Sequence, residues 1–136
     1  MSDEATITTL IRGWVKAIRD GDLDAVLADH SPDIVMFDVP PPDDGVRGLS
    51  AYRESWPPFF ERLRSGAMFE IVDLTVTAGT DVAFAYALLR CGMPDELAEH
   101  PDHRLRVTVG LRKVDGRWVV THEHHSFPDD ADAATP

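Results

Sequence analysis

The stretch RLRVTVGLRKVDGRWVVTHEHHSF, residues 104–127, decides how this 136-residue chain folds. Two segments rich in β-branched and aromatic residues flank Asp115-Gly116, a dipeptide typical of the two-residue turn of a β-hairpin. Residues that oppose each other across such a hairpin share one face of the sheet. Counting outward from the turn predicts a set of inward-facing pairs: Leu111 with Val120, Val109 with His122, Val107 with His124, and Leu105 with Ser126.

Four consecutive polar residues, HEHH at 122–125, are divided between the two faces by this register, because side chains alternate along a strand. His122 and His124 are expected on the apolar face that the helices cover, together with Ser126. The opposite face is expected to carry the other polar side chains: Arg106, Thr108, Thr121, Glu123 and His125. This assignment requires a regular ladder, since a slip of one residue exchanges the faces.

Helical patterning dominates the first half of the chain. Apolar residues recur at helical spacing over 7–18, and Gly21 can end that helix in a left-handed conformation. A short second helix is expected after Asp22 and should end at Pro32. A third helical pattern covers 50–66, and the proline pair at 57–58 should kink it or divide it in two.

Strands are predicted for most of the remaining chain. DIVMFDVP, at 33–40, indicates a first strand in which Ile34, Met36 and Asp38 share a face. Two more strands are expected at 68–78 and 81–91, with a loop over 94–101 before the hairpin. Three helices followed mostly by antiparallel strands predict a single α+β domain over 1–128, with a flexible acidic tail at 129–136.

Composition excludes several classes of partner. The net charge of −11 disfavours a nucleic-acid surface, which needs clustered Lys and Arg, and repels anionic membranes. The N-terminus lacks a signal pattern, and no apolar run approaches a membrane span. One cysteine, Cys91, cannot form an internal disulfide. We therefore expect a cytoplasmic protein with no nucleic-acid or membrane partner.

Several strings, in this order, resemble the SnoaL-like and ketosteroid-isomerase-like proteins of the nuclear transport factor two-like superfamily. They are DGDLDAV at 20–26, DIVMFDVPPP at 33–42, the helix start at Gly48 and DGRWVVTHEH at 115–124. The resemblance spans roughly Ile7 to Pro128. It implies a cone-shaped barrel, in which a strongly curved sheet wraps around a long helix and encloses an apolar pocket. It also implies a homodimer built on the outer sheet face.

The resemblance carries site residues with it. In the isomerase branch the general base is an aspartate at the end of the first strand, a position that falls on Asp38. The oxyanion tyrosine falls on Trp14, and the second acid falls near Val109 or Gly110, so both donors of that mechanism are missing. Steroid isomerisation is therefore not expected. Dehydratases of the superfamily instead combine an aspartate with pocket histidines and tyrosines, which here would be Asp38, His122, His124 and Tyr52 or Tyr86.

The candidate catalytic residues are Asp38, His122 and His124, since a carboxylate in apolar surroundings and an imidazole can both transfer protons near neutral pH. Asp38 could instead cap the proline loop or pair with Arg47, and the histidines could be hydrogen-bonded core residues. The His-x-His pair could also hold a metal ion with Asp38, although we expect no metal and no cofactor. The expected ligand-binding residues are Trp14, Tyr52, Trp56, Phe60, Tyr86, Val107, Val109 and Ser126.

Two kinds of function fit these residues. The first is cofactor-independent acid–base chemistry on a small apolar carbonyl compound, by an isomerase, cyclase or dehydratase. The second is a non-catalytic module that binds a hydrophobic ligand or serves only for dimerisation. In either case we expect a homodimer through the outer sheet face that bears Arg106, Thr108, Thr121 and His125.

Overall fold

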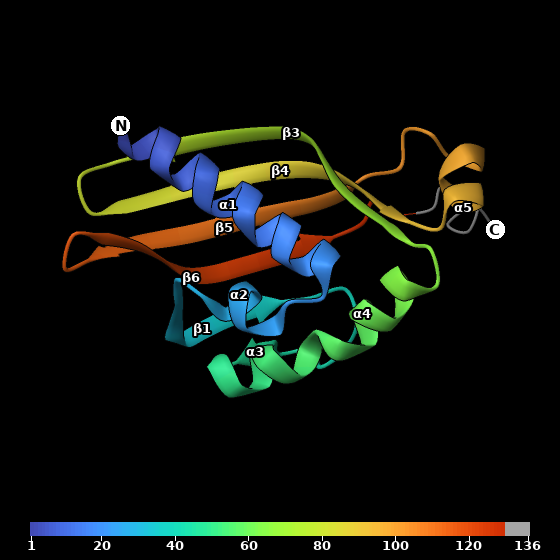
Figure 1. The fold of residues 1–136 in the computed structure, drawn as a ribbon, viewed down its shortest axis with the longest axis horizontal. Coiled ribbons are helices and arrows are strands. Elements are labelled where there is room, and N and C mark those ends of the chain that lie inside the picture. The colour runs from blue at the N-terminus through green and yellow to red at the C-terminus, as the bar shows by residue number, and fades with distance from the viewer. Residues whose placement is uncertain (130–136) are drawn as a thin grey trace.

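A six-stranded sheet organises the computed structural model, which describes residues 1–129 (Figure 1). Its strands are β1 (His30–Phe37), β2 (Val46–Arg47), β3 (Met68–Ala78), β4 (Val82–Gly92), β5 (Leu105–Val114) and β6 (Arg117–Ser126). They lie in the order β2-β1-β6-β5-β4-β3, and every neighbouring pair is antiparallel except β1 with β6. The tail expected at 129–136 lies outside the described residues from position 130 onward.

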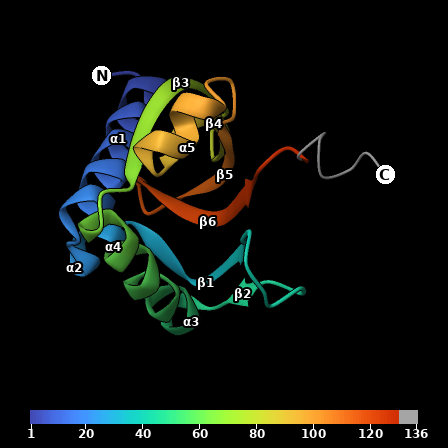
Figure 2. The same ribbon diagram turned by 90° about the vertical axis from the view of Figure 1, so that its right-hand side faces the viewer.

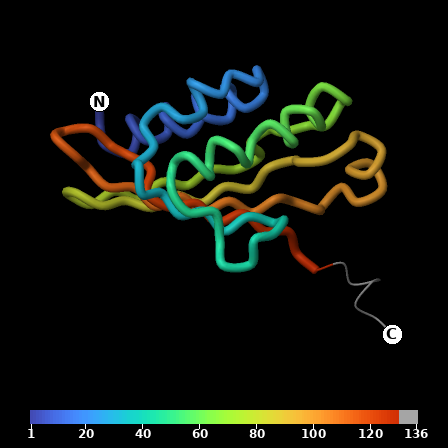
Figure 3. Tube along the Cα trace, turned by 90° about the horizontal axis from the view of Figure 1, so that it is seen from below, coloured from blue at the N-terminus to red at the C-terminus, as the bar shows by residue number. Residues whose placement is uncertain are grey.

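Within residues 1–129, five helices accompany the sheet: α1 (Asp3–Asp20), α2 (Leu23–Leu27), α3 (Leu49–Ser55), α4 (Pro57–Arg64) and α5 (Pro94–Glu99). Figure 3 shows α1 to α4 on one side of the sheet. Figure 2 shows the strong curvature of the sheet, which does not close, because β2 and β3 remain its edges. The predicted α+β fold, with helices packed on a curved and mainly antiparallel sheet, is confirmed.

Local signals explain where the helices begin and end. The Ser2 side chain accepts a hydrogen bond of 3.1 Å from the Ala5 N–H at the start of α1, and Gly21 ends α1 with φ of 67°. Pro57 divides the third helical segment into α3 and α4 by starting a new helix, as predicted.

Two predictions about the elements are wrong: the end of the second helix and the loop at 94–101. The second helix ends at Leu27 and not at Pro32, which lies within β1. Proline is tolerated there because β1 has no ladder partner on β6 between His30 and Val35. The segment expected as a loop at 94–101 contains α5, whose Leu97 is buried.

The hairpin between β5 and β6 follows the predicted register only near its turn. Asp115 and Gly116 both have positive φ, and Leu111 pairs with Val120 as predicted. Beyond Leu111 a β-bulge inserts one extra residue, Thr121, into β6. The observed pairs after the bulge are Gly110 with His122, Val109 with Glu123, Thr108 with His124, Val107 with His125, and Arg106 with Ser126.

The bulge reverses the predicted faces of residues 122–126. Glu123 and His125 are buried beneath the helices, 1% and 6% exposed, whereas His122, His124 and Ser126 lie on the outer face. Parallel pairing with β1, where Val35 pairs with His122, holds this part of β6 in its shifted register. The prediction that His122, His124 and Ser126 face inward is therefore wrong.

Among residues 1–129, no helix has the length and apolar content needed to cross a bilayer.

Candidate functional site

Glu123 is the centre of a polar network buried between the sheet and the helices. Its Oε1 lies 2.9 Å from Nε2 of His125. Its Oε2 lies 2.9 Å from Nε2 of His30 and accepts a hydrogen bond of 2.7 Å from the Tyr52 hydroxyl. A buried carboxylate loses its hydration, and such partners must compensate for that loss. Both oxygens of Glu123 are satisfied in this way.

The charges of this network stabilise one another. Burial by itself raises the pKa of Glu123, but hydrogen bonds from His125 and His30, together with their charges, lower it to about 2. Burial lowers the pKa of His125, whereas its contacts with Asp38 and Glu123 and their charges raise it to about 9. At neutral pH Glu123 is therefore an anion and His125 is a cation.

Tyr52 and Trp14 extend the network toward α1. The Trp14 indole N–H donates to the Tyr52 hydroxyl over 3.0 Å. Nδ1 of His30 donates to the Ala28 carbonyl over 2.8 Å, because a carbonyl can only accept, and this turns Nε2 toward Glu123. Burial, with the nearby charge of Glu123, raises the pKa of Tyr52 well above its ordinary value. The phenol therefore stays neutral and acts as a hydrogen-bond donor.

His125 connects the buried network to Asp38 at the surface. Its Nδ1 lies 3.5 Å from Oδ1 of Asp38, which is an ion-pair distance and longer than an ordinary hydrogen bond. Asp38 follows the end of β1 on the same face as the buried Ile34 and Met36, as the alternation of β1 predicts. Its side chain is 23% exposed, and Oδ1 also accepts the N–H of Val39 over 2.8 Å. The three residues Glu123, His125 and Asp38 thus form a relay that is open to a ligand at Asp38.

A pocket of about 370 Å³ opens beside Asp38 and His125, between α3, α4 and the ends of the strands. Trp56, Phe59 and Phe69 form an aromatic wall, which Val39, Leu105 and the prolines 40 and 58 extend. The remaining lining residues are Ser55, Arg62 and Cys91. A volume of this size lies in the range of small-molecule sites, and an apolar wall with a few polar groups is typical of them.

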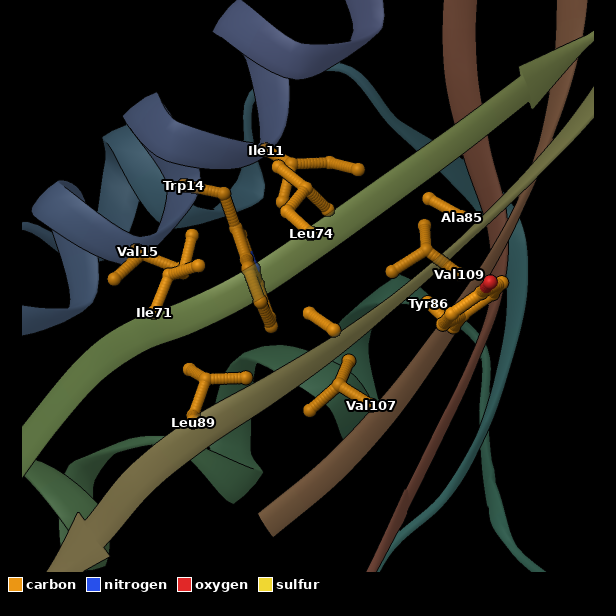
Figure 4. Close-up of a pocket in the computed structure, with 11 residues that line it drawn as sticks. Ile11, Trp14, Val15, Ile71, Leu74, Ala85, Tyr86, Leu89, Val107 and Val109 are labelled. Carbon is orange, nitrogen blue, oxygen red and sulfur yellow. The ribbon is translucent and has the colours of Figure 1, made fainter. Parts of the chain in front are cut away.

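The interior between α1 and the sheet, by contrast, is filled. Figure 4 shows Trp14 reaching from α1 toward β3, β4 and β5, among Ile71, Leu74, Val107 and other apolar side chains. The cavity that remains there is about 10 Å³, which is no more than the space of one water molecule. A ligand therefore has room beside Asp38 and not around Trp14.

The structure brings only some of the predicted site residues together. Trp56 lines the pocket. Phe60 is buried, and its ring stacks on that of Trp56 with 6.4 Å between the ring centroids. Trp14 and Tyr52 belong to the buried network, while Val107 and Val109 pack in the filled core. Four predicted residues lie elsewhere, on the outer sheet face: Tyr86, His122, His124 and Ser126.

The two histidines of this outer face contact β1. Nδ1 of His122 donates to the Val35 carbonyl over 2.6 Å, and the Phe37 ring meets His122 and His124 edge-on. Because His122 and His124 lie on the face opposite Asp38, the three cannot share one metal ion. Within residues 1–129, no group of three or more His, Cys, Asp or Glu side chains is arranged to hold a metal ion.

Sequence reasoning missed three members of the network: His30, Glu123 and His125. One signal could have placed the last two. A glycine inside a strand often marks a bulge, and Gly110 lies directly opposite the bulge in β6. A Cβ at position 110 would approach that of His122 to 3.5 Å. No comparable signal identifies His30, whose partner Glu123 is 93 residues away in the sequence.

Comparison with known proteins places this geometry in a family. The model of the SnoaL-like domain matches residues 7–130. The chain belongs to the SnoaL-like domain family. An NTF2-like protein of unknown function from Pseudomonas putida KT2440 is 37% identical, with a TM-score of 0.81, and the match covers 96% of this chain and 89% of that one. No curated protein sequence matches the chain.

More distant structures share the SnoaL-like fold alone. A proposed ketosteroid isomerase from Shewanella frigidimarina is 20% identical, with a TM-score of 0.71, covering 87% of this chain and 92% of that one. An NTF2-like protein with a cystatin-like fold from Novosphingobium aromaticivorans is 18% identical, with a TM-score of 0.71, covering 94% and 83%. The resemblance to this superfamily that the sequence indicates is therefore confirmed for the fold.

Proposed function

We propose that this protein catalyses cofactor-independent proton transfer on a small apolar carbonyl compound, with Asp38 as the base and His125 as the acid. The observation that carries the proposal is the shared pocket. A half-buried carboxylate and a buried, positively charged imidazole line the same apolar cavity. An ionised carboxylate can take a proton and a protonated imidazole can give one. Two such groups in different surroundings can therefore divide the base and acid roles between them.

The chemistry follows from the positions of the two groups. Asp38 takes the proton from the carbon next to the substrate carbonyl, and the electron pair of that C–H bond forms an enolate. His125 donates a hydrogen bond, or its Nδ1 proton, to the enolate oxygen. The separation of 3.5 Å between Nδ1 and Asp38 is longer than an ordinary hydrogen bond, so the Nδ1 proton is available to a ligand oxygen without a turn of the ring. Return of the proton from Asp38 to another carbon gives an isomer. Departure of a β-hydroxyl as water, with the proton that Asp38 has taken, gives dehydration.

Glu123 supports this division of roles. Its negative charge, 2.9 Å from the opposite nitrogen of His125, keeps the imidazole protonated. Water has little access to that contact, because Glu123 is 1% exposed. The relay therefore presents an acid to the pocket at neutral pH and holds its ring in one orientation.

A ketosteroid-isomerase-like mechanism in the strict sense is not proposed. The indole N–H of Trp14 is taken up by Tyr52, and neither Val109 nor Gly110 can supply an acidic proton. The likeness to a proposed ketosteroid isomerase supports only the broader class of proton transfer next to a carbonyl. Isomerase, cyclase and dehydratase activities all belong to that class.

Hydrogen exchange tests the proposal without knowledge of the natural substrate. Small apolar ketones in D₂O are incubated with the protein, and loss of the α-proton signal is followed by NMR. We expect exchange that Asp38→Asn and His125→Gln each slow roughly a hundredfold. Asp43→Asn, in the exposed proline loop, is the control and should exchange at the wild-type rate. Ketones that bind without exchanging would instead support a ligand-binding module.

We also propose that the protein is a homodimer through its outer sheet face. Alternate residues of β4 expose a row of apolar side chains on that face: Val82, Phe84, Tyr86 and Leu88, each between 36% and 60% exposed. Contiguous apolar surface of this kind is typical of an interface. Arg106 and Thr108 lie on this face as expected, but His125 does not, because the bulge turns it inward.

A further inference from the structure

We propose that the substrate of this pocket carries a carboxylate, which Arg62 binds in the same pocket that Asp38 and His125 line. The inference rests on the proposed function for the reacting end of the ligand and adds its chemical class. Arg62 comes from the last turn of α4 and lines the pocket together with the aromatic wall. A guanidinium is the side chain best suited to bind a carboxylate, since its N–H groups match both oxygens.

Arg62 has no carboxylate partner of its own among residues 1–129, where no acidic oxygen lies within 4.0 Å of its guanidinium. Its helical neighbour Arg64 differs, because it pairs with Glu61, although all three side chains are exposed. The other cation of the pocket, His125, is already held between Glu123 and Asp38. Arg62 is thus the cation of the lining without an anionic partner, and it is available to a ligand carboxylate.

The remaining ionisable groups orient such a ligand. The charge of Asp38 repels a carboxylate from the reacting end of the pocket. Cys91 adds no competing anion, because burial and, to a smaller extent, the charge of Asp38 raise the pKa of its thiol to about 11, although the charge of Arg62 lowers it. The apolar body of a ligand can pack against Trp56 and Phe69, which line the same pocket. The substrate is therefore a compact acid with an apolar body and a carbonyl group.

The cleft on the other side of Arg62 limits how far this anion can extend. That cleft shares Phe59, Arg62 and Cys91 with the pocket, and its own lining includes Glu96, Glu99, Asp102 and Asp129. Four carboxylates oppose a second anionic group or a long anionic chain beyond Arg62. A monocarboxylic acid that fits the pocket volume of about 370 Å³ is compatible with the lining of the pocket and with the acidic lining of the cleft.

Matched pairs of neutral and anionic probes test the proposal by binding alone. Phenylacetate, 3-phenylpropanoate and 4-phenylbutanoate are each compared with the corresponding amide by calorimetry at pH 7 and low salt. We expect the best-fitting carboxylate to bind roughly tenfold more tightly than its amide, as for a charge-assisted hydrogen bond at a partly exposed site. Arg62→Gln should remove this preference, and Arg64→Gln should keep it.

Four results would overturn the inference, three of them in the comparison of acid with amide. They are equal affinity for acid and amide in the wild-type protein, an unchanged preference in Arg62→Gln, and an equal loss in Arg64→Gln. Failure of every carboxylate to bind at millimolar concentration also contradicts it. Because these are equilibrium measurements, they do not depend on proton transfer. Carboxylates that require Arg62 for binding while no ketone exchanges its α-proton would support this inference and contradict the proposed function.

Discussion

Replacement of Glu123 by glutamine tests the buried relay most directly. Glutamine has nearly the same shape but no charge, and its amide N–H₂ would face donors from His125 or from Tyr52 and His30. The variant therefore removes the anion that both imidazoles contact while leaving the packing of β6 almost unchanged. Breaking a buried ion pair from one side costs about 3–5 kcal/mol.

The pH dependence of stability gives an independent value for the free energy of the contact between Glu123 and His125. The pKa of His125 is raised from 6.5 to about 9, so this contact stabilises the fold fully below pH 6.5 and is lost as the pH rises through about 9. A difference of that size corresponds to about 3 kcal/mol. The pKa of Glu123 is lowered from 4.5 to about 2, so its stabilisation is present above pH 4.5 and lost as the pH falls through about 2. The two pKa shifts describe the same interaction between Glu123 and His125, so their free energies are not added.

Urea unfolding at pH 6, 7.5 and 9 measures these effects. At pH 6 we expect Glu123→Gln to lower the free energy of unfolding by about 3 kcal/mol, and the decline of stability from pH 6 to 9 to shrink. Some decline remains, since Asp38 still contacts His125. Glu61→Gln is the control, because Glu61 pairs with Arg64 at an exposed site and should cost less than about 1 kcal/mol. A Glu123→Gln protein as stable as wild type at pH 6 would refute the reasoning.

Two further predictions concern the core and the outer face. Trp14→Phe removes the hydrogen bond to Tyr52 and should cost about 2 kcal/mol in urea unfolding. A double-mutant cycle with Tyr52→Phe should show coupling of about 1 kcal/mol, so additive effects would contradict it. Light scattering should give a mass near twice 15.1 kDa for the wild-type protein. Phe84→Lys should halve that mass without unfolding the protein, whereas a wild-type monomer at every concentration would exclude the dimer.

Local patterns predicted most of the fold. The apolar stripe of α1, its end at Gly21 and the hairpin turn at Asp115 and Gly116 all depend on residues a few positions apart. The same is true of Asp38, whose face follows from alternation along one strand. Its place at the pocket was therefore accessible from the sequence, although its catalytic role remains a prediction.

The composition of the relay was not accessible in this way. Tyr52 and Glu123 are 71 residues apart, and no local pattern says that they touch. The face of Glu123 itself depends on a bulge that one residue, Thr121, creates, and a slip of one position reverses every later side chain. Gly110 was the one sequence signal for the bulge. It was not decisive, because a glycine inside a strand can also simply weaken the strand.

By itself the sequence determined most of the elements, the end of α1 at Gly21, the hairpin turn and the inward face of β1, because steric preferences and hydrophobic periodicity act between residues close along the chain. Only the tertiary structure decided which side chains of β6 are buried. There the parallel contact with β1 selects the shifted register, in which the buried carboxylate of Glu123 meets two imidazoles and a phenol. Such a charge is stable in the interior only when all its partners arrive together, and those partners come from β1, α3 and β6.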